Sequence, residues 1–218
     1  MRRFLKAIFL LMIPVLLIVG AVRVVTFPWF PAWEYRRATF PAAPLPAGER
    51  SRLARECIIF LNAPRDIERL AGLRLPDGAA AFNERELHHM SDVKEVYDAL
   101  SVAALVALVL VVSAGGVLQR RGSGAEVWGA LSSGALMTLS ALSLLGMLMW
   151  LSWDDFFVGL HRLLFPAGSW LFQYTDTLIR LFPMRFWQDA GLAVVGVIAV
   201  LAFTLALVGR MMQRRVAG

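Results

Sequence analysis

The chain has 218 residues, of which 58% are hydrophobic, with a formal charge of +6 and a mean hydropathy of +0.63. This hydrophobic share exceeds the roughly 45–50% of soluble domains and is concentrated in long uncharged runs, which is typical of a membrane protein. The charge does not indicate nucleic-acid binding, because the excess basic residues flank apolar runs and form no patch with interleaved aromatic residues. The single cysteine, Cys57, excludes an intramolecular disulfide and a cysteine-based zinc site.

Four apolar runs are long enough to cross a hydrocarbon core, which needs about 20 residues. They cover 5–27, 99–118, 127–151 and 190–209. The first run is longer than the roughly 7–15 apolar residues of a signal peptide, so we expect an uncleaved anchor. The predicted fold is one integral membrane domain over residues 1–218: an all-α protein with a four-helix transmembrane bundle, a helical extracytoplasmic loop domain and interfacial helices.

The distribution of charge predicts the orientation of these spans. The two termini and the turn at 119–126 carry basic residues opposed only by Glu126. The loops at 28–98 and 153–189 have no such excess, so we expect them outside and both termini in the cytoplasm. This orientation predicts a multi-pass protein of the bacterial cytoplasmic membrane, with any active site on its outer face. The basic residues counted on the cytoplasmic side are Arg2, Arg3, Lys6, Arg120, Arg121, Arg210, Arg214 and Arg215.

Arg23 is the basic residue inside the first apolar run, four residues from its outer end. Its side chain can extend outward to the polar interface. Alternatively, it can bind a carboxylate such as Asp154 or a lipid headgroup.

Two helices are predicted in the first outer loop. Leu53, Cys57 and Phe60 recur at helical spacing over 49–62, after an extended linker at 41–48. A second helix starts near residue 84, where Asn83 and Glu86 can form a capping box, and continues into the second span.

This second helix carries two adjacent histidines about 15 Å before the span. Asp92 is four residues from His88, while Glu86 and Asp92 are each three residues from His89, so these side chains can meet on the helix surface. The histidines can also be solvated residues of an exposed turn. A zinc site is disfavoured, because adjacent histidines diverge on a helix and no pair has i, i+4 spacing.

The second outer loop predicts a short interfacial helix around His161, capped by Asp154 or Asp155 and ended by Pro166. Another short helix is expected at 178–182, capped by Thr175 or Asp176. An apolar setting would keep His161 neutral, which suits proton transfer. The alternative is a histidine at the polar edge of an amphipathic helix.

Two motifs in these loops resemble a known family. The first is Phe82-Asn-Glu-Arg-Glu-Leu-His-His-Met-Ser-Asp-Val-Lys94, similar to F-x-x-x-E-x-x-H-M-x-D-V-K; the second is Asp155-Phe-Phe-x-x-x-His161-x-x-x-Phe165, followed by Trp170, Asp176 and Leu181-Phe-Pro-x-x-Phe-Trp187. With four spans and two outer loops, the chain resembles the lipoprotein intramolecular transacylases (Lit) of bacteria over nearly its whole length. His88 is an additional histidine beside the motif position.

The resemblance implies a membrane-bound acyltransferase acting on a diacylated bacterial lipoprotein among membrane lipids. It would move the sn-2 acyl chain of the diacylglyceryl group to the α-amine of the N-terminal cysteine, giving a lyso-form lipoprotein. The resemblance implies His89 and His161 as catalytic residues. We expect His89 as the base, aligned by Glu86 or Asp92, and His161 as the acid or oxyanion donor, with the reverse assignment left open.

The resemblance also makes Asp155, Trp170 and Asp176 candidates for binding or orienting the substrate. Arg23 is a further candidate because of its position inside the first apolar run. No metal or cofactor is expected, because two imidazoles can supply base and acid. Two other functions are compatible with the sequence. One is another lipid acyltransferase or esterase of the outer leaflet, and the other is a non-catalytic membrane assembly factor.

Overall fold

The computed structural model describes residues 1–41, 45–64 and 66–217. Within these ranges the regular structure is helical, apart from one isolated bridge between Arg74 and Ala80. The predicted linker at 41–48 falls partly on residues 42–44, which lie outside the described residues, and α3 begins at Ala47. The chain packs as two compact units. We call them the membrane unit (Met1–Arg23, Leu100–Leu151 and Leu192–Gly218) and the loop unit (Val24–Ala99 and Ser152–Gly191).

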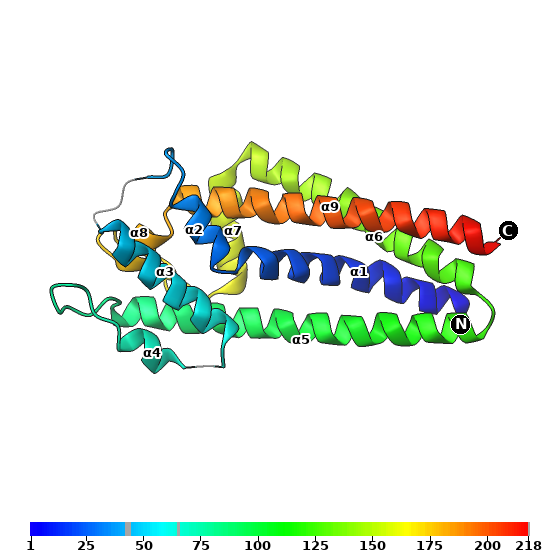
Figure 1. Ribbon diagram of the computed structural model, residues 1–218, viewed down its shortest axis with the longest axis horizontal. Helices are drawn as coiled ribbons and strands as arrows, with labels where there is room; N and C mark the ends of the chain where they lie inside the picture. The colour runs from blue at the N-terminus through cyan, green and yellow to red at the C-terminus, as the bar shows by residue number, and fades with distance from the viewer. Residues whose placement is uncertain (42–44, 65, 218) are drawn as a thin grey trace. The chain divides into compact units, whose positions relative to one another are not determined.

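Within the described ranges, four helices are long and apolar enough to cross a membrane, which is the number of spans predicted. They are α1 (Arg2–Val25), α5 (Glu84–Arg120), α6 (Gly124–Leu151) and α9 (Met184–Ala217), the longest ribbons in Figure 1. α5 runs unbroken from Glu84 into the apolar segment, as predicted from the lack of a proline or glycine before Gly115.

Small residues and close contacts hold the membrane unit together. Phe9 of α1, Leu118 of α5 and Ala130 of α6 are buried in one cluster. A Cβ atom at Gly134 of α6 would lie 2.8 Å from the Phe9 carbonyl oxygen, so only glycine allows α1 and α6 to approach this closely. Such small contact residues are typical of membrane helices, where the hydrophobic effect does not drive helix association.

The α6–α9 contact follows the same principle. Ser132 Oγ donates a hydrogen bond of 3.1 Å to the Ala206 carbonyl, and a Cβ at Gly209 would meet the Trp128 carbonyl at 2.8 Å. Hydrogen bonds between membrane helices contribute about 0.6 kcal/mol on average. The glycine contact and the hydrogen bond therefore act together to fix the α6–α9 packing.

Both chain termini lie at the end of the membrane unit where α5 turns into α6 (Figure 1). Glu126 at the start of α6 forms ion pairs with Lys6 at 2.8 Å and Arg2 at 3.1 Å, and a cavity there is lined by Lys6, Glu126 and Gln213 of α9. The basic segments that predict the cytoplasmic side are therefore at one end of this unit.

The loop unit contains α2 (Trp29–Glu34), α3 (Ala47–Asn62), α4 (Ile67–Ala71), α7 (Trp153–Leu164) and α8 (Thr177–Leu181). The predictions for α3, α7 and α8 agree with these bounds within a few residues. α2 and α4 were not predicted from the sequence, because one is six residues long and contains Pro31 and the other has only five residues. Asp66 caps α4 by accepting a 3.3 Å hydrogen bond from the Arg69 amide.

The cap predicted for α7 was wrong. Ser152, not Asp154 or Asp155, is the N-cap residue, and its hydroxyl accepts a hydrogen bond of 3.4 Å from the Asp155 amide. Ser152 has the extended backbone that an N-cap requires, whereas both aspartates already lie in the first turn. Asp176 does occupy the N-cap position of α8, but its side chain makes no capping hydrogen bond there.

Hydrogen bonds from buried side chains of α5 connect it to the end of α3. Lys94 is 5% exposed, and its Nζ donates to the Leu61 carbonyl at 3.0 Å and to Asp98 at 2.7 Å. Tyr97 donates to Asn62 at 2.8 Å. Because α5 carries the motif histidines, this contact fixes the helix that positions them.

Candidate active site

Two histidines from separate helices come together in the loop unit. His89 on α5 and His161 on α7 have ring centroids 6.5 Å apart and ring planes 20° from parallel. The His89 side chain is 9% exposed, and His161 is half-buried. The fold therefore brings together the two histidines that the motifs predict, although 72 positions of sequence (161 − 89) separate them.

Aromatic rings surround the pair. The ring centroids of Phe165 and Phe172 lie 5.0 Å and 5.2 Å from that of His89. Phe157 lies 4.0 Å and Trp170 5.0 Å from His161. This apolar lining lowers the local dielectric constant, so electrostatic interactions with a reacting group are stronger than in solvent.

A backbone contact fixes the tautomer of His161. Its Nδ1 lies 2.8 Å from the carbonyl oxygen of Phe157. Because a carbonyl oxygen only accepts hydrogen bonds, Nδ1 carries the proton, and Nε2 of the neutral ring has the free lone pair. His161 Nε2 is thereby prepared to accept a proton.

Burial keeps both histidines neutral near pH 7. His89 precedes the apolar run of α5 by ten residues, and desolvation, helped by the nearby His161, lowers its pKa to about 4. Desolvation also lowers the pKa of His161, against the opposing effect of its hydrogen bond to the Phe157 backbone. Neutral imidazoles can exchange protons with a substrate without the cost of burying two positive charges.

Two polar atoms at this site lack partners. His89 Nδ1 and Trp170 Nε1 are both buried and make no hydrogen bond to any residue within the described ranges. Buried polar atoms in native proteins are nearly always paired. The rings that carry these two unpaired atoms both lie beside His161, so the atoms mark a place where a polar substrate group fits.

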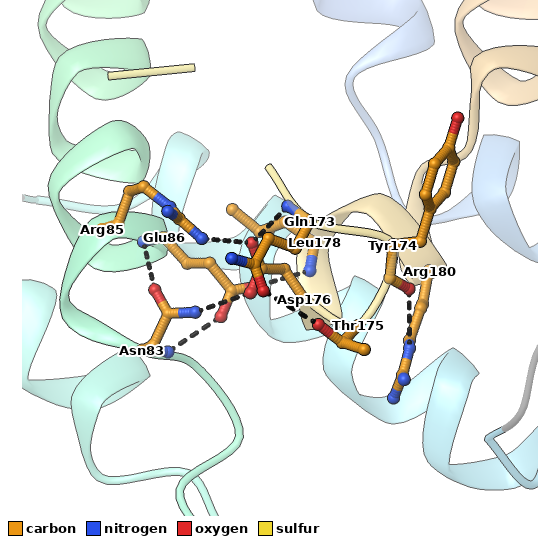
Figure 2. Close-up of polar contacts among 9 residues, drawn as sticks. All are labelled: Asn83, Arg85, Glu86, Gln173, Tyr174, Thr175, Asp176, Leu178 and Arg180. Carbon is orange, nitrogen blue, oxygen red and sulfur yellow. Dashed lines mark hydrogen bonds and ion pairs between the residues drawn. The ribbon is translucent and has the colours of Figure 1, made fainter. Parts of the chain in front are cut away.

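A polar network joins the start of α5 to the segment before α8, as Figure 2 shows. The predicted capping box is confirmed, since the Asn83 amide donates to Glu86 at 2.8 Å and the Glu86 amide donates to Asn83 Oδ1 at 3.0 Å. The second Glu86 oxygen accepts a hydrogen bond of 2.6 Å from the Leu178 amide. Both carboxylate oxygens of Glu86 thus accept hydrogen bonds from backbone amides, one at the start of α5 and one in α8. Glu86 therefore does not align the His89 ring, as the sequence had suggested.

Asp176 is the second acidic residue of this network. Its carboxylate accepts hydrogen bonds from Arg85 Nη2 at 2.6 Å, the Gln173 amide at 2.8 Å and Asn83 Nδ2 at 2.9 Å (Figure 2). Burial alone would raise the pKa of Asp176, but the donors at Gln173 and Arg85 outweigh it and lower the pKa. We call the set Asn83, Arg85, Glu86, Asp176 and Leu178 the clasp. It fixes the chain just after Phe172, one of the aromatic residues at His89.

The remaining candidates have other contacts. One oxygen of Asp92 lies 3.9 Å from Nε2 of the exposed His88, and its other oxygen is buried without a hydrogen bond to any described residue. Asp155 accepts a hydrogen bond of 2.7 Å from the Ser152 hydroxyl at the start of α7. Arg23 belongs to the membrane unit, where it donates to the Ser101 hydroxyl.

Sequence reasoning missed Arg85 and Phe172. Phe172 has no spacing relation to either histidine, so only its position in an aromatic-rich loop was a signal. Arg85 lies inside the first motif, but its partner Asp176 is 91 residues away. A motif read along the chain does not reveal such a pair.

Cys57 is not a nucleophile for this site. It is 1% exposed within α3, and burial raises the pKa of its thiol far above the usual range. Among the residues that the structure describes, there is also no group of three or more His, Cys, Asp and Glu side chains that can hold a metal ion.

The fold and the site define a multi-pass membrane protein with a paired-histidine site in its loop unit. The sequence matches the family model of the lipoprotein intramolecular transacylase Lit over residues 7–187. The chain therefore belongs to the lipoprotein intramolecular transacylase (Lit) family, and it is an acyltransferase of lipoprotein maturation.

A relative and two solved structures are similar to this chain along most of its length. An uncharacterized protein from Aquifex aeolicus is 29% identical over 209 residues, covering 95% of this chain and 92% of that protein. The structure of the membrane integral transacylase Lit from Bacillus cereus superposes with a TM-score of 0.80 at 20% identity, covering 99% of this chain and 98% of that one. A structure of the same protein with one histidine replaced by alanine gives a TM-score of 0.79 at 19% identity, covering 99% and 94%.

Proposed function

We propose that the protein transfers an acyl chain from oxygen to nitrogen within one lipoprotein molecule. The sn-2 chain of the diacylglyceryl group on the N-terminal cysteine moves to the α-amine of that cysteine, which leaves a lyso-form lipoprotein. The observation that carries this proposal is the contact between His89 and His161 in an aromatic site, with His161 Nε2 prepared to accept a proton.

The reaction needs a base, because an α-amine with a pKa of about 7.7–8.0 is protonated in most molecules near pH 7. We assign the base to His161, since its Nδ1–H is bound to the Phe157 carbonyl and its Nε2 is the basic nitrogen. This is the reverse of the assignment first expected from the sequence. His89, whose pKa of about 4 keeps it neutral, would donate an N–H to the leaving glycerol oxygen.

The connection between ester and amine supplies much of the remaining rate. Both groups belong to one molecule, and well-oriented intramolecular reactions reach effective molarities of about 10⁵–10⁸ M. General acid–base catalysis contributes about 10²–10⁴-fold for a positioned side chain. The aromatic lining would hold the acyl ester away from water and so favour aminolysis over hydrolysis.

Mass spectrometry of the product tests the reaction. The protein should be expressed in a bacterium that accumulates diacylated apolipoprotein and lacks its own N-acylating enzyme. We expect an N-terminal lipopeptide of unchanged mass whose fragments carry one acyl chain on nitrogen and one on glycerol. A gain of one chain would indicate an external donor, and the loss of one chain would indicate an esterase.

We further propose that both termini are cytoplasmic and that the histidine site faces the outer leaflet, where lipoproteins are processed. Support comes from the basic residues gathered at one end of the membrane unit, including Arg2 and Lys6. Reporter fusions at positions 75 and 170 should be active outside the cytoplasm, and fusions at 122 and the C-terminus should be active inside. A cytoplasmic signal at 170 would overturn this orientation.

A further inference from the structure

The indole N–H of Trp170 is a buried hydrogen-bond donor without an acceptor among the described residues. Its ring lies 5.0 Å from the His161 ring, centroid to centroid. An indole N–H can donate a hydrogen bond but cannot accept one. A buried donor without an acceptor destabilises the fold, so its presence beside a histidine pair requires an explanation.

In two other tryptophans of the loop unit, the indole N–H has an acceptor. The Trp29 indole donates to the Val24 carbonyl at 2.8 Å, and that of Trp153 donates to the Met184 sulfur at 3.0 Å. Trp170 differs from both because its N–H is enclosed at the site and still has no acceptor within the described ranges. The acceptor that suits this donor is therefore a group that arrives with the substrate.

The backbone around Trp170 is also fixed. Gly168 has a φ of 85°, a conformation that glycine adopts without strain. The Ser169 amide donates to the Pro166 carbonyl at 3.2 Å, and the Leu171 amide donates to the Gly168 carbonyl at 3.4 Å. The segment is held again at Gln173, whose amide donates to Asp176 of the clasp. A donor held from both sides is preorganised, which is what stabilising a transient charge requires.

We propose that Trp170 is a catalytic residue whose Nε1–H donates a hydrogen bond to the carbonyl oxygen of the migrating acyl group. The bond strengthens when that oxygen becomes an oxyanion, because hydrogen bonds to ionised acceptors are about twice as strong as neutral ones. This inference rests on the proposed acyl transfer and assigns the oxyanion donor that the reaction needs. It leaves His161 as the base and His89 as the donor to the leaving oxygen.

The step balances as follows. The lone pair of the cysteine α-amine attacks the ester carbonyl carbon, the C–N bond forms, and the carbonyl π electrons move to the oxygen bound by Trp170. His161 Nε2 takes the proton that the nitrogen loses. The oxyanion then re-forms the carbonyl, and the bond to the glycerol oxygen breaks. That oxygen takes from protonated His161 the proton that the amine lost and becomes a hydroxyl, while the His89 N–H donates a hydrogen bond to it and remains on the ring.

The test removes only the N–H. Replacing Trp170 with 3-benzothienylalanine keeps the bicyclic ring and exchanges the N–H for sulfur, and Trp170→Phe is the encoded counterpart. Turnover is measured on a synthetic diacylated lipopeptide in detergent micelles, with kcat and KM determined separately. We expect kcat to fall by about 10²–10³-fold, the usual effect of losing one oxyanion donor, with KM nearly unchanged.

The same replacement at Trp153 is the matched control, because its N–H donates to a sulfur within the loop unit. We expect that variant to retain wild-type kcat. An unchanged kcat in the Trp170 variant, or an equal fall in both variants, would overturn the assignment. If instead the wild-type protein forms no N-acyl product, the acyl transfer itself fails, and that outcome is distinct from failure of the Trp170 assignment.

Discussion

The backbone amide of Leu178 donates a 2.6 Å hydrogen bond to Glu86, although the two residues are 92 positions apart. Glu86 lies in the first turn of the helix that carries His89, and Leu178 lies in α8, just after the aromatic segment that contacts the histidines. One buried carboxylate therefore joins the two parts of the chain that form the site. This contact makes the clasp a positioning device and not a group that touches the reacting atoms.

The clasp predicts a coupled loss of stability and activity. Asp176→Ala removes the buried carboxylate that accepts hydrogen bonds from Arg85, Asn83 and the Gln173 amide. Because these three donors belong to exposed residues that water can reach, we expect a loss of about 1–3 kcal/mol in total. We expect a lower melting temperature in detergent and a lower kcat, because Phe172 and Trp170 lose their fixed positions. Asp154→Asn, at an exposed position of α7, is the control and should change neither quantity. Full activity in Asp176→Ala would show that the clasp does not position the site.

The four spans and the unbroken α5 were predictable because hydropathy, helix breakers and the capping box are local properties of the sequence. Asn83 and Glu86 show how far such local reasoning extends. Their reciprocal cap was predicted from three-residue spacing, whereas the bond from Glu86 to Leu178 depends on tertiary packing.

In the site, too, local sequence properties were predictable and tertiary contacts were not. The motifs identify His89 and His161, but their 6.5 Å contact follows from the packing of α5 against α7. Asp92 and Glu86 both had suitable spacing to align His89, yet one faces His88 and the other caps α5. Sequence spacing offers several partners for a side chain, and only packing selects among them.

The histidines can be ranked by substitution. His89→Ala and His161→Ala should each reduce turnover by about 10²–10⁴-fold, the range for a general acid or base. His88→Ala is the matched control on the same helix, and we expect a mild effect because its side chain is 67% exposed and pairs only with Asp92 among the described residues. Membrane levels of all three variants should equal wild type in immunoblots. Wild-type turnover in either key variant would remove that histidine from the mechanism.

The lowered histidine pKa values predict the pH dependence. The substrate amine loses its proton at about pH 7.7–8.0, whereas both histidines in the folded protein titrate below 6.5. We therefore expect log(kcat/KM) to rise with a slope near 1 from about pH 6.5 to 7.7 and more steeply below that range. A slope well above 1 between pH 6.5 and 7.7 would mean that a histidine also titrates in that range, contrary to this account.

The stability of the folded protein should also decrease as the pH falls. His89 has a folded-state pKa of about 4 and an unfolded value of 6.5, so the unfolded chain binds more protons between these values. Its contribution is complete above pH 6.5 and is lost as the pH falls toward 4. The wild-type melting temperature should therefore fall more over this range than that of His89→Phe, which has no proton to bind. Equal slopes in the two proteins would contradict the lowered pKa.

Two glycines of α6 give a matched test of the membrane unit. A Cβ at Gly134 would lie 2.8 Å from Ile13 Cβ and from the Phe9 carbonyl, whereas a Cβ at Gly146 would enter open space among the described residues. Gly134→Ala should destabilise the protein by about 1–3 kcal/mol through overpacking, and Gly146→Ala should not. Thermal unfolding in detergent measures both. An unaffected Gly134→Ala protein would mean that α1 and α6 do not approach so closely.

The central claim is that the acyl chain moves within one lipoprotein molecule, and a crossover experiment tests it most directly. Two diacylated lipopeptides are mixed in equal amounts, one with deuterated acyl chains and an isotopically heavy peptide, the other with neither label. After turnover by the wild-type protein, mass spectrometry should find only N-acylated products in which heavy chains remain on heavy peptides and light chains on light peptides. Products that combine a heavy chain with a light peptide would contradict intramolecular transfer and would indicate exchange between molecules.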